Sequence, residues 1–218
     1  MRHRVTGVAY LLYFLTAISG ASFISGIVVQ GDAIATSNNI LAHRSSYQLG
    51  LAIGTISLAF YIVVTTRFYS LFRPVNRDLS LLAAFFSLVG CVIQAFGGIF
   101  QLAPLVILEH GRYTNEFTIG QLQAQALMFL ELKSRAEIIA LVFFGLYCLL
   151  IGYLIFKSAF LPQFLGVLMM LAGVGWLTFL SPSFASRLSP FNLALGILAE
   201  GLLMLWLLVR GVQQPAAS

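Results

Sequence analysis

The chain has 218 residues, of which 60% are hydrophobic and only 9% are charged, and its mean hydropathy is +0.95. An ordinary soluble domain carries about 25% charged residues, so this chain cannot build a water-facing surface of the usual kind. Its 19 Phe and 8 Tyr residues also exclude a disordered chain, because so much apolar surface does not stay solvated. The composition therefore predicts a protein embedded in a lipid bilayer.

Six apolar runs are near or above the length of about 20 residues that a helix needs to cross the hydrocarbon of a membrane. The runs are continuous rather than alternating, which favours helices over the strands of a membrane barrel. We therefore predict an all-α membrane protein, a six-transmembrane-helix bundle that forms one integral membrane domain over residues 1–218. The predicted spans are residues 5–29, 47–72, 79–108, 137–156, 164–180 and 191–209.

The Lys and Arg residues are distributed unevenly between the two sides of the predicted bundle. Cytoplasmic loops of membrane proteins are enriched in these residues, so the richer side indicates the cytoplasm and places both termini there. Their position at the ends of apolar runs also explains the net charge of +5 without a nucleic-acid partner, and the lipid bilayer is the partner we expect. The richer side holds seven residues: Arg2, Arg4, Arg67, Arg73, Arg77, Lys157 and Arg210. The other side holds five: Arg44, Arg112, Lys133, Arg135 and Arg187.

The outer loop between the third and fourth spans carries a helical pattern of its own. Thr118 and Gln121 have the spacing of a capping box, and apolar residues recur at helical spacing from Ile119 to Leu130. We predict an extra amphipathic helical segment here, which either lies on the outer membrane surface or continues into the fourth span. No Gly or Pro separates Leu130 from Glu137, which favours one long helix, bent or broken near Lys133. The first outer loop, residues 30–46, is expected to carry a short helical turn.

One acidic residue, Glu200, falls in the middle of the last predicted span. A charge at the centre of a bilayer costs about 2.5–3.5 kcal/mol on insertion scales, so such a residue is usually partnered or functional. Gln94 and Gln101 lie seven residues apart on one face of the third span, and Tyr147 brings a hydroxyl from the fourth. We predict a ligand or proton site from Glu200, Gln94, Gln101 and Tyr147. The structural alternative is that these groups only tie helices together.

An outer-face polar cluster is predicted near the start of the fourth span, from Glu131, Arg135 and Glu137. Glu131 and Arg135 have the four-residue spacing of a helical ion pair. A lipid-modifying enzyme would need a cleft that joins this cluster to Glu109 and His110.

The sequence supplies no recognisable metal, cofactor or catalytic set. The three histidines, His3, His43 and His110, all fall outside the predicted spans, and no common catalytic motif is present. Cys91 and Cys148 lie inside apolar runs and are predicted to be free, packed thiols. Three classes of function stay open. A protein that binds a small or lipid-like ligand or moves a proton is favoured over a structural or regulatory membrane subunit, and an enzyme comes last.

Four stretches of the chain resemble the DUF4386 family of bacterial integral membrane proteins. They are LVFFGLYCLLIGYLIFKSAFLPQFLGVL (residues 141–168), RPVNRDLSLLAA (73–84), the ending from Glu200 to Gly211, and residues 31–41. The resemblance covers nearly the whole chain and implies a multi-pass protein of the bacterial inner membrane with no established activity. Many relatives have Arg where Ser87 stands and His near Ser134, so a polar site formed there in relatives is altered or lost in this chain.

Overall fold

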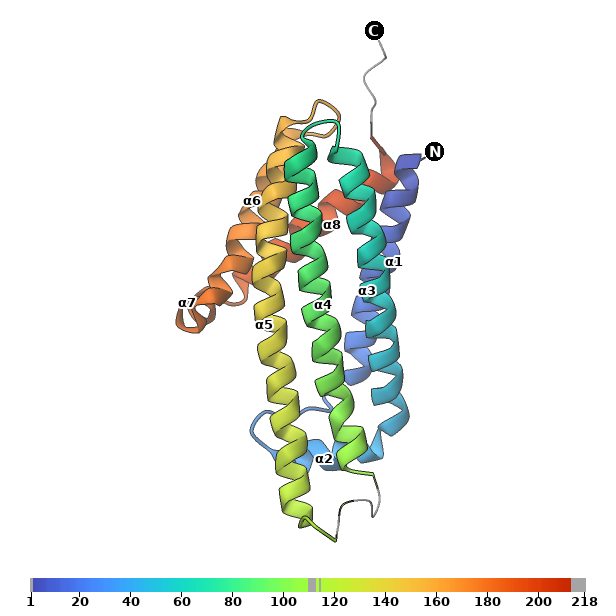
Figure 1. Ribbon diagram of the computed structural model, residues 1–218, viewed down its shortest axis with the longest axis vertical. Helices are drawn as coiled ribbons and strands as arrows, with labels where there is room; N and C mark the ends of the chain where they lie inside the picture. The colour runs from blue at the N-terminus through green and yellow to red at the C-terminus, as the bar shows by residue number, and fades with distance from the viewer. Residues whose placement is uncertain (1, 110–112, 114, 213–218) are drawn as a thin grey trace. The chain divides into compact units, whose positions relative to one another are not determined.

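The computed structural model describes residues 2–109, 113 and 115–212, and within this part of the chain every regular element is helical (Figure 1). The all-α prediction is therefore confirmed. In chain order the elements are α1 (Arg2–Ile24), α2 (Ala33–Ala42), α3 (Arg44–Phe72), α4 (Arg77–Ile107), α5 (Ile119–Lys157), α6 (Gln163–Leu177), the 3-10 turn η1 (Thr178–Leu180), α7 (Pro182–Leu188) and α8 (Phe191–Val209).

Six helices of the described chain are long and apolar enough to cross a membrane, which confirms the predicted number. They are α1, α3, α4, α5, α6 together with η1, and α8. The first helix ends at Ile24, five residues before the predicted boundary, because the chain turns at Gly26, whose φ of 78° suits a glycine. The short turn expected in the first outer loop is the ten-residue helix α2.

Helix α5 includes the loop segment that was predicted to be amphipathic. It runs for 39 residues from Ile119 to Lys157, so this segment is not a separate helix, and the break expected near Lys133 is not there. The predicted capping box is confirmed. The Thr118 backbone N–H donates to Gln121 Oε1 at 2.8 Å, and the Gln121 N–H donates to Thr118 Oγ1 at 3.3 Å.

The chain divides into two compact units, which we describe separately. Unit 1 consists of residues 1–13, 59–92 and 138–218, and unit 2 consists of residues 14–58 and 93–137. Unit 1 therefore contains α6, η1, α7 and α8, and unit 2 contains α2. The single integral membrane domain inferred from the sequence stays a prediction.

Glycines bring α5 and α6 into close contact within unit 1. A Cβ atom added to Gly166 would lie 2.6 Å from the carbonyl oxygen of Gly152, and one added to Gly152 would lie 2.6 Å from that of Gly166. Gly145 and Gly173 meet in the same reciprocal way, two helical turns away. Helices in lipid associate through such close packing, because the lipid tails compete for ordinary apolar contacts.

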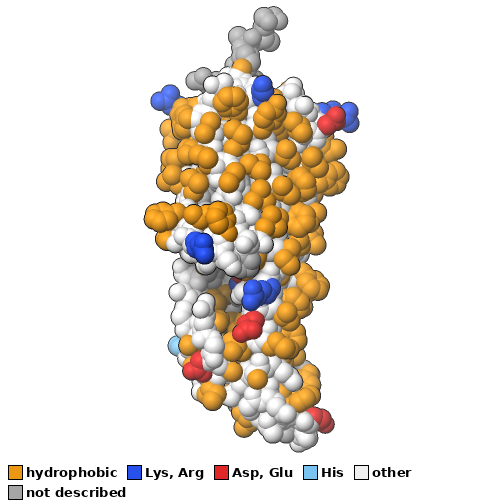
Figure 2. Space-filling view, turned by 90° about the vertical axis from the view of Figure 1, so that its left-hand side faces the viewer, with side chains coloured by type: hydrophobic (Ala, Val, Ile, Leu, Met, Phe, Trp, Pro, Cys, Tyr) orange, Lys and Arg blue, Asp and Glu red, His pale blue; other side chains and the backbone are white. Residues whose placement is uncertain are grey.

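The outer surface of unit 1 is apolar. Large side chains are exposed on α6 and α8, including Val174 (55%), Ile197 (61%) and Phe191 (77%). In the space-filling view, hydrophobic side chains cover much of the face around α6 and α7, and Lys and Arg side chains lie at its upper end and again near mid-height (Figure 2). A hydrophobic surface bordered by basic residues is typical of a protein surrounded by lipid.

Candidate functional site

The Glu200 side chain points into the core of unit 1. Glu200 lies midway along α8 and is only 7% exposed, and Ala199 and Leu203 beside it are fully buried. The opposite side of the helix, with Ile197 and Leu198, is more than half exposed. The carboxyl group is thus turned away from the surface where lipid would lie.

The nearest partner of Glu200 is a tyrosine of the first helix. The fully buried Tyr10 hydroxyl donates a hydrogen bond to Glu200 Oε2 at 2.7 Å, across 190 residues of sequence. One turn earlier, Gly7 allows α1 to approach α8, since a Cβ atom there would lie 2.7 Å from the backbone nitrogen of Leu208. The glycine therefore helps to place the tyrosine against the acid.

The second carboxyl oxygen faces a thiol. Cys148 Sγ on α5 lies 3.8 Å from Glu200 Oε1, the arrangement of a weak S–H donor. Both Cys148 and Cys91 are free and buried, as the sequence predicted. Each oxygen of this carboxyl group therefore has a partner that carries a proton, and the two partners come from two other helices.

Aromatic rings surround these polar groups. The Tyr61 ring on α3 has its centroid 4.6 Å from that of Tyr13, 6.4 Å from that of Tyr10 and 6.1 Å from that of Tyr147. Tyr147 is 1% exposed, and its hydroxyl has no hydrogen-bond partner among the described residues. We call Glu200, Tyr10, Cys148, Tyr61 and Tyr147 the Glu200 cluster.

The structure places the predicted glutamines in unit 2, whereas Glu200 and Tyr147 belong to unit 1. Gln101 is buried, and its backbone carbonyl accepts a hydrogen bond of 2.7 Å from the Tyr47 hydroxyl. Gln94 is half-buried. That these two amides face Glu200 stays a prediction.

The sequence did not single out Tyr10 and Cys148 as partners of Glu200. Their positions along their helices nevertheless indicate that they lie at a similar depth in the membrane. Tyr10 follows Arg2 by eight residues, Cys148 precedes Lys157 by nine, and Glu200 precedes Arg210 by ten. Basic residues at the same ends of helices mark one membrane boundary, so three side chains at nearly equal distances from it lie at similar depth. Comparison of depths would have made both residues candidates, although it does not show which helices are neighbours.

The predicted outer-face cluster is only partly assembled. Lys133 Nζ lies 2.7 Å from Glu137 Oε1, one helical turn away on α5. No ion pair joins Glu131 to Arg135 in the described chain, and both side chains are exposed. The ion pair of this spacing that the structure shows is Lys133–Glu137, and the outer-face cluster of Glu131, Arg135 and Glu137 stays a prediction.

The cleft that an outer catalytic site would need stays a prediction. Glu109 Oε1 lies 3.9 Å from Arg44 Nη2, and His110 falls outside the described residues. The described chain also contains no group of three or more His, Cys, Asp or Glu residues that could hold a metal ion.

A second polar region lies in unit 2, where α1 ends and α2 begins. Thr36 makes two hydrogen bonds of 3.0 Å with Val29, one to its N–H and one to its carbonyl. The Asn39 amide donates to the Ile27 carbonyl at 3.2 Å, and the carboxylate of Asp32 caps α2 by accepting from the Ala35 N–H at 2.8 Å. We call this region the α1–α2 corner.

Comparison with known proteins identifies the family. The domain of unknown function DUF4386 matches residues 5–211, nearly the whole chain. An uncharacterized protein of Archaeoglobus fulgidus is 25% identical over 153 residues, which make up 69% of this chain and 76% of the relative. No solved structure matches the chain. The family match and the six apolar helices agree with the resemblance seen in the sequence, and the chain belongs to the DUF4386 family.

Proposed function

We propose that this protein crosses the bacterial inner membrane six times, with both termini in the cytoplasm, and that Glu200 binds and releases a proton within the membrane. The uneven distribution of Lys and Arg supports this orientation. The apolar surface of unit 1 supports the surrounding lipid.

The observation that carries the proposal is the buried carboxyl group of Glu200 with the Tyr10 hydroxyl 2.7 Å away. An acid in the middle of a membrane helix is costly to insert and is usually functional or paired. A serine or an amide would tie two helices through a hydrogen bond without that cost. A carboxyl group in this place gives the protein what those groups lack, a side chain that can ionise by releasing a proton and become neutral by binding one.

The surrounding side chains favour a proton over a larger ligand. The rings of Tyr10, Tyr13 and Tyr61 contact one another directly around the acid, with centroids 4.6 to 6.4 Å apart. The Tyr147 hydroxyl, buried and without a partner in the described chain, is a candidate for the next group in a proton path. A proton needs no cavity, and neighbouring hydroxyl groups can pass it on.

The test replaces Glu200 by Gln. This change keeps the shape of the side chain and its capacity for hydrogen bonds, but the amide cannot ionise. We expect infrared difference spectra of the reconstituted protein to show a carboxyl C=O band that changes with pH in the wild type and is absent from Glu200→Gln. Glu137→Gln, in the outer part of α5, is the control and should leave that band unchanged. A Glu200 band that stays constant over the whole pH range would contradict the proposal.

The second candidate is the structural or regulatory subunit. The Tyr10–Glu200 hydrogen bond favours it as well, because the bond joins α1 to α8. A Glu200 carboxyl that stabilises the fold and never exchanges its proton with pH would support this reading.

A further inference from the structure

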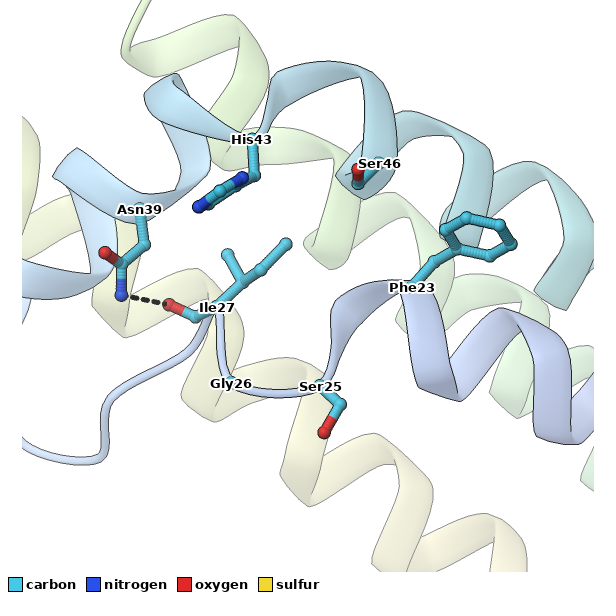
Figure 3. A pocket seen from close by; sticks show the side chains of 7 residues that line it. All are labelled: Phe23, Ser25, Gly26, Ile27, Asn39, His43 and Ser46. Atoms are coloured by element: carbon cyan, nitrogen blue, oxygen red, sulfur yellow. Dashed lines mark hydrogen bonds between the residues drawn. The ribbon is translucent and has the colours of Figure 1, made fainter.

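A small pocket lies in unit 2 beside the α1–α2 corner, with a volume of about 250 Å³. Its walls come from the last turn of α1, the turn that follows it, α2 and the first turn of α3 (Figure 3). The lining residues are Phe23, Ser25, Gly26, Ile27, Asn39, His43 and Ser46. Pockets for drug-sized ligands usually measure about 300–1,000 Å³, so this one fits a smaller molecule or a single ring-sized group.

The pocket is lined by uncharged groups and one imidazole. No Lys, Arg, Asp or Glu is among the seven lining residues. The neighbouring Arg44 lies outside the lining, and its Nη2 atom is 3.9 Å from Glu109 Oε1, so its charge already has a partner. An ion that left water for this pocket would meet no opposite charge there, which makes the transfer costly. The lining therefore favours an uncharged ligand.

The polar side chains of the lining offer both donors and acceptors that the protein does not use. His43 is exposed and Ser46 is half-buried, and neither side chain has a hydrogen-bond partner in the described parts of the chain. Asn39 uses its amide nitrogen to bind the Ile27 carbonyl (Figure 3), and its side-chain oxygen is left as an acceptor. A hydroxyl donates and accepts, and a neutral imidazole has one nitrogen for each role. An anion could only accept from these groups and an ammonium could only donate to them, whereas the hydroxyl groups of a ligand do both.

The remaining wall of the pocket is apolar and lies where two membrane spans end. Phe23 and Ile27 supply this wall, and the Phe23 ring is 39% exposed. The apolar span of α1 ends at Ile24, and that of α3 begins at Arg44, so the pocket can be reached from the lipid–water boundary. A molecule with a hydroxylated edge and an apolar C–H face matches both kinds of wall.

We propose that this pocket binds a neutral sugar ring, with the hydroxyl groups of the sugar bound to His43, Ser46 and Asn39 and its C–H face against Phe23. The ring can belong to the headgroup of a glycolipid or to a free sugar, because both present the same chemistry to the pocket. The assignment is independent of the proton chemistry proposed for Glu200, since no lining residue belongs to the Glu200 cluster.

The experiment measures the binding of monoglucosyl diacylglycerol to the purified protein by native mass spectrometry, in a detergent without sugar groups. We expect the double variant His43→Ala/Ser46→Ala to bind about tenfold more weakly, because it loses two hydrogen bonds to the ligand. The matched control is Ser45→Ala/Gln48→Ala, two exposed neighbours outside the lining, which should bind like the wild type. Equal binding by the wild type and the His43/Ser46 variant would overturn the proposal.

A smaller change repeats the test without risk to the fold. Ser46→Ala should weaken binding, and Ser46→Thr, which keeps the hydroxyl, should not. Equal binding by these two variants would contradict a hydrogen bond from Ser46 to the ligand. The thermal unfolding midpoint of each variant should equal that of the wild type, since neither His43 nor Ser46 has a hydrogen-bond partner in the described chain.

Three further ligands identify which part of the glycolipid is recognised. Diacylglycerol has the same tails without the sugar, and phosphatidylglycerol replaces the sugar by a charged group, so both should bind much more weakly. Equal binding of diacylglycerol would show that the sugar is not recognised. Displacement of the glycolipid by methyl glucoside at similar concentrations would assign the pocket to a free sugar, and displacement only at much higher concentrations would assign it to a lipid headgroup. No displacement at any concentration would contradict a sugar site.

Discussion

The two polar regions of the protein are held together by different kinds of contact. In the Glu200 cluster the acid is bound by side chains that lie 190 and 52 residues away in sequence, and all of them are buried. In the α1–α2 corner the hydrogen bonds span 3 to 12 residues and mostly join a side chain to the backbone. The corner can therefore form from local sequence, whereas the cluster exists only when three helices have assembled.

The largest expected effect tests the assembled region. Tyr10→Phe removes the hydroxyl that binds Glu200 and leaves a buried carboxyl oxygen without its donor, at a cost of about 1–3 kcal/mol in the free energy of unfolding. Titration with a denaturing detergent, followed by tryptophan fluorescence, measures the change. Tyr153→Phe, at an exposed position of α5, should change stability little.

A double-mutant cycle sharpens this result. If Tyr10 and Glu200 stabilise each other, Tyr10→Phe should cost less in a Glu200→Leu background than in the wild type. Equal costs in both backgrounds would mean that the tyrosine acts through its ring contacts and that the hydrogen bond contributes nothing.

The intermediate effect tests the local region. Thr36→Val removes both hydrogen bonds to Val29 while keeping the shape of the side chain, and should cost about 1–2 kcal/mol. Hydrogen exchange should become faster in α2 and stay unchanged in α8. Thr55→Val, which removes only a bond to Leu51 in the same helix, is the matched control. Faster exchange in α8 would break the distinction between a local and an assembled region.

The smallest effect belongs to the surface of α5. Lys133→Met removes the ion pair with Glu137 and should cost about 0.3–0.5 kcal/mol, since both side chains are partly exposed to solvent. The difference between variant and wild type should shrink as salt is added. Glu131→Gln, whose side chain forms no ion pair in the described chain, should have no comparable effect.

The sequence predicted most reliably what a single helix determines. The six spans followed from apolar length, the start of α5 from the Thr118–Gln121 spacing, and the special position of Glu200 from the cost of inserting an acid. Each of these depends on residues close to one another in the chain. The sequence also favoured one long helix for α5, but the break expected near Lys133 is not there.

What the sequence could not supply is the choice between equivalent partners. Glu131–Arg135 and Lys133–Glu137 have the same spacing, and only side-chain packing selects the second pair. Likewise, the sequence offered the glutamine amides either as partners of Glu200 or as ties between helices, and the order in which helices pack decides which side chains reach the acid. Tyr10 reaches it because α1 lies against α8, and no pattern within either helix encodes that adjacency.

The reciprocal glycines of α5 and α6 have a consequence for how variation is tolerated. Each lacks the Cβ atom that would strike the opposing carbonyl, so the two backbones come near enough for Cα–H···O contacts along the seam. In a library of random substitutions, residues 145, 152, 166 and 173 should be depleted of every larger amino acid, whereas Gly201, which has open space beside it, should accept alanine. At the contact between α5 and α6, selection would therefore depend on the volume of the side chain and hardly on its polarity.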